Sequence, residues 1–124
     1  MRPAICFEML YPEASPEEKV RRIADHGFSA VEFWGWRDKD LPALGAVCRK
    51  SGVRVANFSG HRRGSPIARE THGVFLDDLR DAVRAAQDLE CSTLMVLSNE
   101  LAEGGVVVDS WDRISPQEKF SSFV

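Results

Sequence analysis

A histidine and two arginines stand side by side between glycines in the stretch Gly60-His61-Arg62-Arg63-Gly64. The stretch directly follows an apolar segment, so it would begin where a buried strand ends. Imidazole titrates near neutral pH and guanidinium pairs with carboxylate or phosphate, so these side chains suit the binding of an anionic substrate. The alternative is a solvated basic loop, which is the usual role of such a run. We expect His61 and Arg62 to bind substrate.

Two glutamates, Glu8 and Glu32, interrupt segments that are otherwise apolar. A buried carboxylate is costly unless it is paired or hydrogen-bonded, so each one needs a reason to be there. They line a polar cavity, or they hold loops by accepting backbone N–H groups or by pairing with an arginine. Both interpretations stay open for Glu32, whereas the second fits Glu8 better.

Two further polar stretches follow apolar segments. Trp34-Gly35-Trp36-Arg37 carries aromatic residues that would wall a substrate pocket or simply cover a rim. Ser98-Asn99-Glu100 opens a loop that extends to Ile114, and a loop of that length in a compact domain is usually functional or mobile.

The histidines and cysteines show no metal-ligand spacing. His72 stands just ahead of a helical pattern, where capping or exposure is the expected role. His26 stands near the end of another, where a cation is favoured in any case. No nucleophile motif or phosphate loop is present either. We therefore expect no metal site in this chain.

Alternating strands and helices must position these polar stretches. Ser15-Pro16-Glu17-Glu18 combines a capping serine, a proline suited to the first helical position and a glutamate at capping-box spacing. Gly27 and Gly52 are typical of helix ends. The apolar patterns predict strands over residues 4–10, 28–34, 53–59 and 93–97, and helices between residues 15 and 27, over 41–51 and 74–89, and from 115 onward.

Two internal repeats support this order of elements. His26–Phe33 recurs as Ser51–Phe58, so that a glycine leads twice into a strand with one polar residue before its phenylalanine. Ser115-Pro116-Gln117-Glu118-Lys119 echoes Ser15-Pro16-Glu17-Glu18-Lys19, which predicts a fourth helix. We expect residues 1–124 to form a single unit that is truncated within that helix.

Strand–helix alternation predicts an α/β fold with a parallel sheet covered by helices. A doubly wound sheet normally opens with a Gly-rich phosphate turn, but Tyr11-Pro12-Glu13-Ala14 occupies that place. A TIM barrel has eight units in about 250 residues, so the four or so parallel (β/α) units predict half of a barrel. Alternate strand residues would face its axis, among them Glu32, Val55 and Asn57.

Composition limits the functional classes. The 124 residues are 44% hydrophobic and 28% charged, which is typical of globular domains, and no apolar run approaches the roughly 20 residues of a membrane span. A net charge of −3 disfavours nucleic-acid binding. Three scattered cysteines fit reduced thiols better than a disulfide framework. We expect a cytoplasmic protein with no membrane or nucleic-acid partner.

The chain contains four segments, residues 4–11, 30–36, 57–62 and 94–100. In this order they resemble bacterial hydroxypyruvate isomerase-like proteins, which belong to the xylose isomerase-like (sugar phosphate isomerase/epimerase) TIM-barrel superfamily. The resemblance covers nearly the whole chain but only the N-terminal half of the family's barrel. The ordered set, rather than any single motif, carries it.

The resemblance implies aldose–ketose isomerisation of a small hydroxy-carbonyl substrate. In such proteins a carboxylate removes the proton alpha to the carbonyl, and a divalent metal (Mg, Mn, Co or Zn) stabilises the enediolate. Their catalytic glutamates and metal ligands lie on later strands, in patterns resembling Glu-Pro-Leu-Asn and Asp-x-x-His that are absent here. The catalytic residues therefore stay unknown and no cofactor is expected in this chain. A substrate-side role carries over to His61, Glu32, Asn57 and Asn99.

Two other functions compete with this interpretation. One is a non-catalytic half-barrel that assembles with itself as a binding or structural module, and the other is a nucleic-acid repair enzyme of the same superfamily, which the acidic balance disfavours. In either form, four strands would leave unpaired edges at residues 4–10 and 93–97. We therefore expect a homodimer or a larger assembly. Glu90 departs from the family pattern, in which glycine usually ends that helix.

Overall fold

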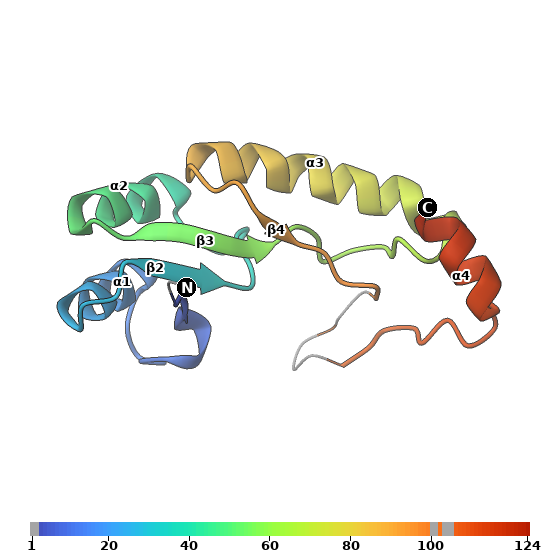
Figure 1. Cartoon of the computed structure of the whole chain (residues 1–124), viewed down its shortest axis with the longest axis horizontal. Coiled ribbons are helices and arrows are strands. Elements are labelled where there is room, and N and C mark those ends of the chain that lie inside the picture. The colour runs from blue at the N-terminus through green and yellow to red at the C-terminus, as the bar shows by residue number, and fades with distance from the viewer. Residues whose placement is uncertain (1–2, 100–101, 103–105) are drawn as a thin grey trace.

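The computed structural model describes residues 3–99, 102 and 106–124 and has a four-stranded parallel sheet with the order β1-β2-β3-β4. Each strand pairs with the next one along the chain, as in successive units of a parallel barrel (Figure 1). The prediction of about four parallel (β/α) units is confirmed. The elements are β1 (Ile5–Cys6), η1 (Phe7–Met9), α1 (Pro16–Asp25), β2 (Ala30–Phe33), α2 (Leu41–Ser51), β3 (Arg54–Ser59), η2 (Arg69–Thr71), α3 (His72–Asp88), β4 (Leu94–Met95) and α4 (Pro116–Phe123).

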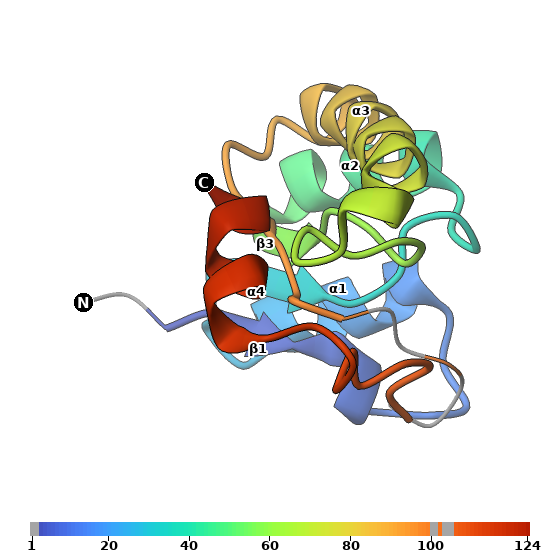
Figure 2. The same ribbon diagram turned by 90° about the vertical axis from the view of Figure 1, so that its right-hand side faces the viewer.

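Helices α1, α2 and α3 lie along one side of the sheet, whereas α4 stands apart beside the start of α3 (Figures 1 and 2). Arg69 ties α4 to η2 by donating to the Ser121 carbonyl at 3.2 Å. In the described ranges no helix is long and apolar enough to cross a membrane.

Three stacked phenylalanines join the first three units on the helix side of the sheet. The ring centroids of Phe7 and Phe33 lie 5.2 Å apart, and those of Phe33 and Phe58 lie 5.1 Å apart. All three side chains are buried, with aliphatic residues of α1 and α2 such as Ile23 and Leu44 in the same core. The three phenylalanines thus belong to one continuous core with these helices.

A bulge between β2 and β3 reverses the facing of part of β3. Val31 pairs with Val55 and Glu32 pairs with Asn57, so Ala56 has no partner in register. Val55 lies in the helix-side core at 5% exposure. The prediction that Val55 faces the axis is therefore wrong. It assumed that successive side chains of β3 point to opposite sides throughout, and the extra residue at Ala56 interrupts that alternation.

The outer strands are shorter than predicted. β1 has two residues and then tightens into the 3₁₀ turn η1, in which the Leu10 amide donates to the Phe7 carbonyl at 3.2 Å. β4 also has two residues, Leu94 and Met95. In the described chain each pairs on one side only, so few ladder hydrogen bonds hold either of them extended.

Local signals define the helices better than the strands. The Ser15 hydroxyl accepts from the Glu18 amide at 3.3 Å, and a reciprocal capping box forms at Ser115 with Glu118. Helix α2 has the predicted bounds and ends at Gly52, whose φ of 66° suits glycine. Helix α3 begins two residues earlier than predicted, at His72, and ends at Asp88.

Candidate functional site

The axis side of the sheet carries a pair of polar side chains. Cys6, Glu32 and Asn57 occupy matching register positions on β1, β2 and β3. The Asn57 side-chain amide donates to Glu32 Oε2 at 2.9 Å, and both residues are half-buried. The bond fixes the carboxylate and leaves its other oxygen, Oε1, able to accept a hydrogen bond from a ligand hydroxyl.

Glu8 has the structural role that its position favoured. One carboxylate oxygen lies 2.7 Å from Lys39 Nζ and accepts the Trp34 backbone N–H at 3.4 Å. The Lys39 side chain is nearly buried, with its ammonium 5.4 Å from the centre of the Phe33 ring. Glu8 thus anchors the loop after β2, with a lysine in place of the expected arginine.

His61 is buried rather than open to a ligand. Its ring is 2% exposed and lies edge-on to the Phe75 ring of α3, with 4.8 Å between centroids. A ligand would reach the imidazole only after the loop moved. The predicted substrate contact of His61 stays a prediction.

Asp78 on α3 is a site residue that no sequence motif indicated. It is 2% exposed, and its Oδ2 accepts the backbone amides of Arg62 and Arg63 at 2.7 and 3.3 Å. Its Oδ1 lies 2.7 Å from Arg37 Nη2 and 3.2 Å from Arg63 Nη2. Burial raises the pKa of Asp78. The hydrogen bonds from the Arg62 amide and from the Arg37 and Arg63 guanidinium groups lower that pKa by a larger amount, so it lies below its usual value.

Asp78 could have been suspected from its spacing. It follows Phe75 by three residues and precedes Ala82 by four, which puts a carboxylate on the buried face of an amphipathic helix. Its partners could not have been identified, because they lie on two loops elsewhere in the chain. Both arginine side chains of this loop are exposed, and Asp78 pairs with the guanidinium group of Arg63 but not with that of Arg62.

The loop after β3 is packed tightly against α3. Gly64 has φ of 70°, and a Cβ there would lie 2.7 Å from the Phe75 nitrogen, so only glycine fits. Ser65 and Thr71 exchange hydrogen bonds, with the Ser65 amide donating to Thr71 Oγ1 at 2.9 Å. The Ser65 hydroxyl also donates to the Ser98 carbonyl, which links the loops after β3 and β4. These contacts fix the loop at Gly64 and Ser65, directly beyond Arg62 and Arg63.

A pocket of about 390 Å³ opens beyond the carboxyl ends of β1, β2 and β3, where parallel barrels carry their sites. Trp34 forms an exposed apolar part of its wall, and both interpretations of that stretch stay open. Its lining residues are Glu8, Trp34, Gly35, Trp36, Arg37, Asp38 and Arg62. A larger hollow between η2 and α4 lies away from the strand ends.

The five predicted binding residues have different surroundings. Glu32 and Asn57 meet, Arg62 lines the pocket, and His61 packs against α3. Asn99 follows β4, and its side-chain oxygen is buried with no hydrogen-bond partner among the described residues. Glu100, which the same predicted stretch contains, lies outside the described residues.

The described residues do not fit the divalent metal that the resemblance implies. Within residues 3–99 and 106–124 no three histidine, cysteine, aspartate or glutamate side chains gather as metal ligands. The His72 ring, for example, is hydrogen-bonded through Nε2 to the Pro66 carbonyl at 2.9 Å. The three cysteines are free thiols as predicted, and burial raises the pKa of Cys48 to about 11.

Sequence comparison finds no matching protein-family model and no matching curated protein. Solved structures do match. An AP endonuclease, family 2, from Brucella melitensis has a TM-score of 0.80 and 22% identity, covering 98% of this chain and 46% of that one. A xylose isomerase-like TIM barrel/4-hydroxyphenylpyruvate dioxygenase fusion protein has a TM-score of 0.68 and 19% identity, covering 86% and 17%.

A third structure, a protein from Sinorhizobium meliloti 1021, has a TM-score of 0.63 and 24% identity, covering 82% of this chain and 38% of that one. At such identities the likeness concerns the fold alone. The chain spans less than half the length of each of these structures. The chain has the α/β fold of part of a TIM barrel.

Proposed function

We propose that this chain forms the substrate-side part of an aldose–ketose isomerase of the hydroxypyruvate isomerase type. The observation that carries the proposal is the Glu32–Asn57 pair, a carboxylate and an amide on the axis side of the sheet. Its place agrees with barrel enzymes, whose chemistry gathers around the axis at the carboxyl ends of the strands.

The proposed substrate is a small hydroxy-carbonyl compound, and the protein is proposed to be cytoplasmic, without a nucleic-acid partner. The Glu32 carboxylate accepts a hydrogen bond from the substrate hydroxyl, and Asn57 holds that glutamate side chain in position. The proton transfers through the enediolate and the divalent metal belong to residues outside this chain. The described part of the chain therefore binds and orients the substrate.

The test compares hydroxypyruvate with pyruvate, which lacks the hydroxyl group. Calorimetric titration should show tighter binding of hydroxypyruvate, and Glu32→Gln should abolish that preference because a neutral amide accepts the hydroxyl more weakly. The chain alone should not isomerise hydroxypyruvate above background. Equal affinities for the two acids, unchanged in the variant, would contradict the proposal. Turnover that is lost in Glu32→Gln or His61→Ala would instead place the chemistry in this chain.

A second candidate is a non-catalytic half-barrel that assembles with itself. It is favoured by the sheet edges at β1 and β4, each paired on one side only in the described chain. Apolar side chains near the β4 edge and on α3 are also exposed by 38–45%, namely Leu76, Val83, Met95 and Val96. A dimer that lacks the preference for hydroxypyruvate would favour this candidate.

A further inference from the structure

The pocket beyond the strand ends is formed by two loops that one buried carboxylate holds together. One wall comes from residues 34–38 after β2, and another comes from Arg62 after β3. Asp78 bonds to both loops, through the Arg37 guanidinium and through the backbone amide of Arg62. The relative position of the walls therefore depends on Asp78.

Most charged groups around the pocket already have partners. Glu8 lies 2.7 Å from Lys39, and Asp38 lies 3.3 Å from the same ammonium group. Arg37 lies 2.7 Å from Asp78 and stacks on the Trp36 ring at 4.3 Å. These groups already form ion pairs within the protein, so binding a ligand would require them to give up those partners.

Arg62 differs from its two neighbours. Asp78 engages the guanidinium groups of Arg37 and Arg63, but it engages only the backbone of Arg62, at 2.7 Å. Among the described residues, no ion pair or hydrogen bond reaches the Arg62 side chain, which is exposed at the pocket. The backbone of Arg62 is thus held by Asp78, whereas its guanidinium group is exposed and has no partner among the described residues.

We infer that this pocket is an anion subsite in which Arg62 binds the carboxylate of a small organic acid beside Trp34, with Asp78 as the positioning residue. Guanidinium and carboxylate match as two parallel hydrogen bonds, and the exposed indole offers an apolar surface to the carbon chain. The inference rests on the proposed function in that the acid would be the substrate of the same barrel.

The charges favour a monoanion over a phosphate group. Glu8 and Asp38 line the same pocket, and Lys39 is shared between them. A dianion beside Arg62 would be repelled by these carboxylates more strongly than a singly charged carboxylate would be. The pocket should therefore prefer pyruvate to inorganic phosphate at neutral pH.

The experiment follows the indole N–H signals of the ¹⁵N-labelled 124-residue chain by NMR during titration with sodium pyruvate at constant ionic strength. Trp34 and Trp36 line the pocket, whereas Trp111, before α4, does not and serves as an internal reference. The Trp34 signal should shift and saturate with pyruvate. Pyruvamide, which has no charge, should cause no saturable shift.

Arg62→Gln should weaken pyruvate binding by at least about tenfold, because a hydrogen bond to a charged group is lost. Arg62→Lys should recover part of the pyruvate affinity, because lysine keeps the positive charge but lacks the paired N–H donors of guanidinium. Arg54→Gln, an equal charge change at the exposed start of β3, is the matched control and should bind as the wild type does. Equal weakening in Arg54→Gln and Arg62→Gln, or none in Arg62→Gln, would overturn the inference.

Asp78→Asn tests the positioning role through selectivity. The variant frees the guanidinium groups of Arg37 and Arg63, so phosphate affinity should rise relative to pyruvate affinity. A purely structural role would weaken both ligands alike, and that result would refute the assignment of Asp78. If the variant does not fold, the Arg62 series still decides the subsite. Tighter binding of phosphate than of pyruvate by the wild type would overturn the carboxylate assignment.

Pyruvate lacks the hydroxyl group that Glu32 is proposed to accept. The Arg62 series can therefore succeed when the hydroxypyruvate preference fails, and the reverse also holds. Each result thus identifies which of the two proposals is wrong.

Discussion

The side-chain amide of Asn57 donates a 2.9 Å hydrogen bond to the Glu32 carboxylate across the two central strands of the sheet. The pair forms because the bulge at Ala56 brings Asn57 into register with Glu32. On the other side of the same strands, Phe33 stacks on Phe58. The pairing of β2 with β3 therefore places Glu32 and Asn57 together on the axis side of the sheet, and Phe33 and Phe58 together on the helix side.

Asn57→Ala should lower the free energy of unfolding by about 1–2 kcal/mol, because a half-buried carboxylate loses its hydrogen-bond donor. Glu32→Gln should cost less than about 1 kcal/mol, since its amide oxygen still accepts from Asn57. Urea unfolding followed by circular dichroism measures both values. A larger loss in Glu32→Gln than in Asn57→Ala would show that the charge itself holds the strands.

Asp78→Asn should lower the free energy of unfolding at pH 7 by about 3 kcal/mol, because two guanidinium groups and two amides lose a buried anionic partner. The pKa of Asp78 is lower in the folded protein than its usual value. Its charge therefore stabilises the fold above the unfolded-state pKa of about 3.9, and this contribution is lost as pH falls through the folded-state pKa.

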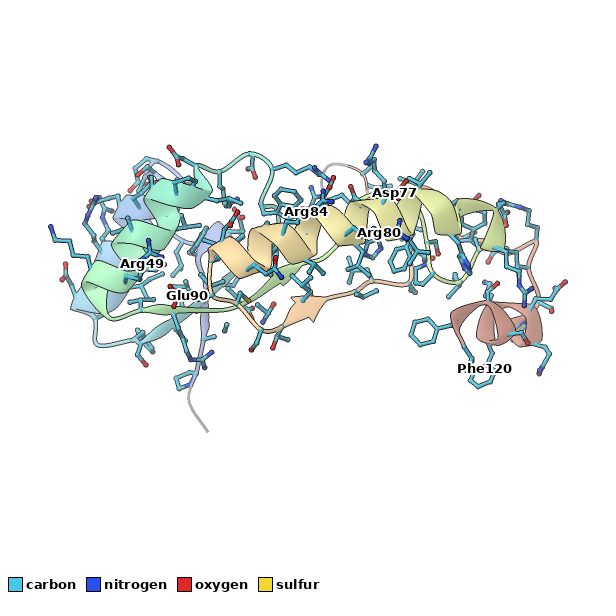
Figure 3. The ribbon with its side chains drawn as sticks, turned by 90° about the horizontal axis from the view of Figure 1, so that it is seen from above. Arg49, Asp77, Arg80, Arg84, Glu90 and Phe120 are labelled. Carbon is cyan, nitrogen blue, oxygen red and sulfur yellow. The ribbon has the colours of Figure 1, made fainter. Side chains whose placement is uncertain are left out.

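Urea unfolding at pH values from 7 to 3 compares the two proteins. The wild type should lose stability more steeply than Asp78→Asn once the pH falls below about 4, where the unfolded chain begins to take up the proton. Parallel curves would mean that Asp78 contributes no charge-dependent stability. Asp77→Asn is the control, because Asp77 is exposed and its partner Arg80 lies on the outer face of α3 (Figure 3).

Glu90→Gly should raise the free energy of unfolding by about 1 kcal/mol. Glu90 has φ of 54°, a left-handed conformation that costs a non-glycine residue roughly 1 kcal/mol and that glycine adopts freely. Its 3.5 Å contact with Arg49 is exposed and contributes little (Figure 3). Glu90→Ala removes the same contact and keeps the strain, so it should not stabilise the chain. Equal thermal midpoints for the two variants would rule out the backbone explanation.

Light scattering after size exclusion should give a mass above the monomer's 13.9 kDa, because a homodimer would pair the open β1 and β4 edges of two copies. Val96→Lys at the β4 edge should shift the population toward monomer. Phe120→Lys, on the exposed face of α4, is the matched control (Figure 3). A monomer mass at every concentration with a cooperative thermal transition would exclude this assembly.

The sequence predicted the elements whose signals are local. Helix α2 has the predicted bounds, and α4 begins at the predicted cap, because a capping residue and a terminal glycine act within one turn. The short β1 was not predictable, because its length depends on tertiary pairing, which holds this edge strand on one side only in the described chain. The bulge at Ala56 was not predictable either, because the alternation of apolar residues in this segment is compatible with a regular strand and with a bulged one.

The candidate site was predictable in part. The repeat placed Glu32 and Asn57 at equivalent positions, and their contact follows from the neighbouring strands. Asp78 was missed because its partners lie 15 to 41 residues away and become neighbours only after folding. Residue type alone could not distinguish Arg62 from Arg63. That difference depends on which arginine Asp78 reaches.

The unequal strand lengths should produce a gradient of backbone protection. β2 and β3 pair over most of their length, whereas β1 and β4 each contribute two paired residues. Amide protons of the inner pair can exchange with solvent only when much of the molecule opens, whereas those of the outer strands exchange through small local openings. Unfolding would then begin at the edges of the sheet, and the Phe33–Phe58 stack would be among the last contacts to separate.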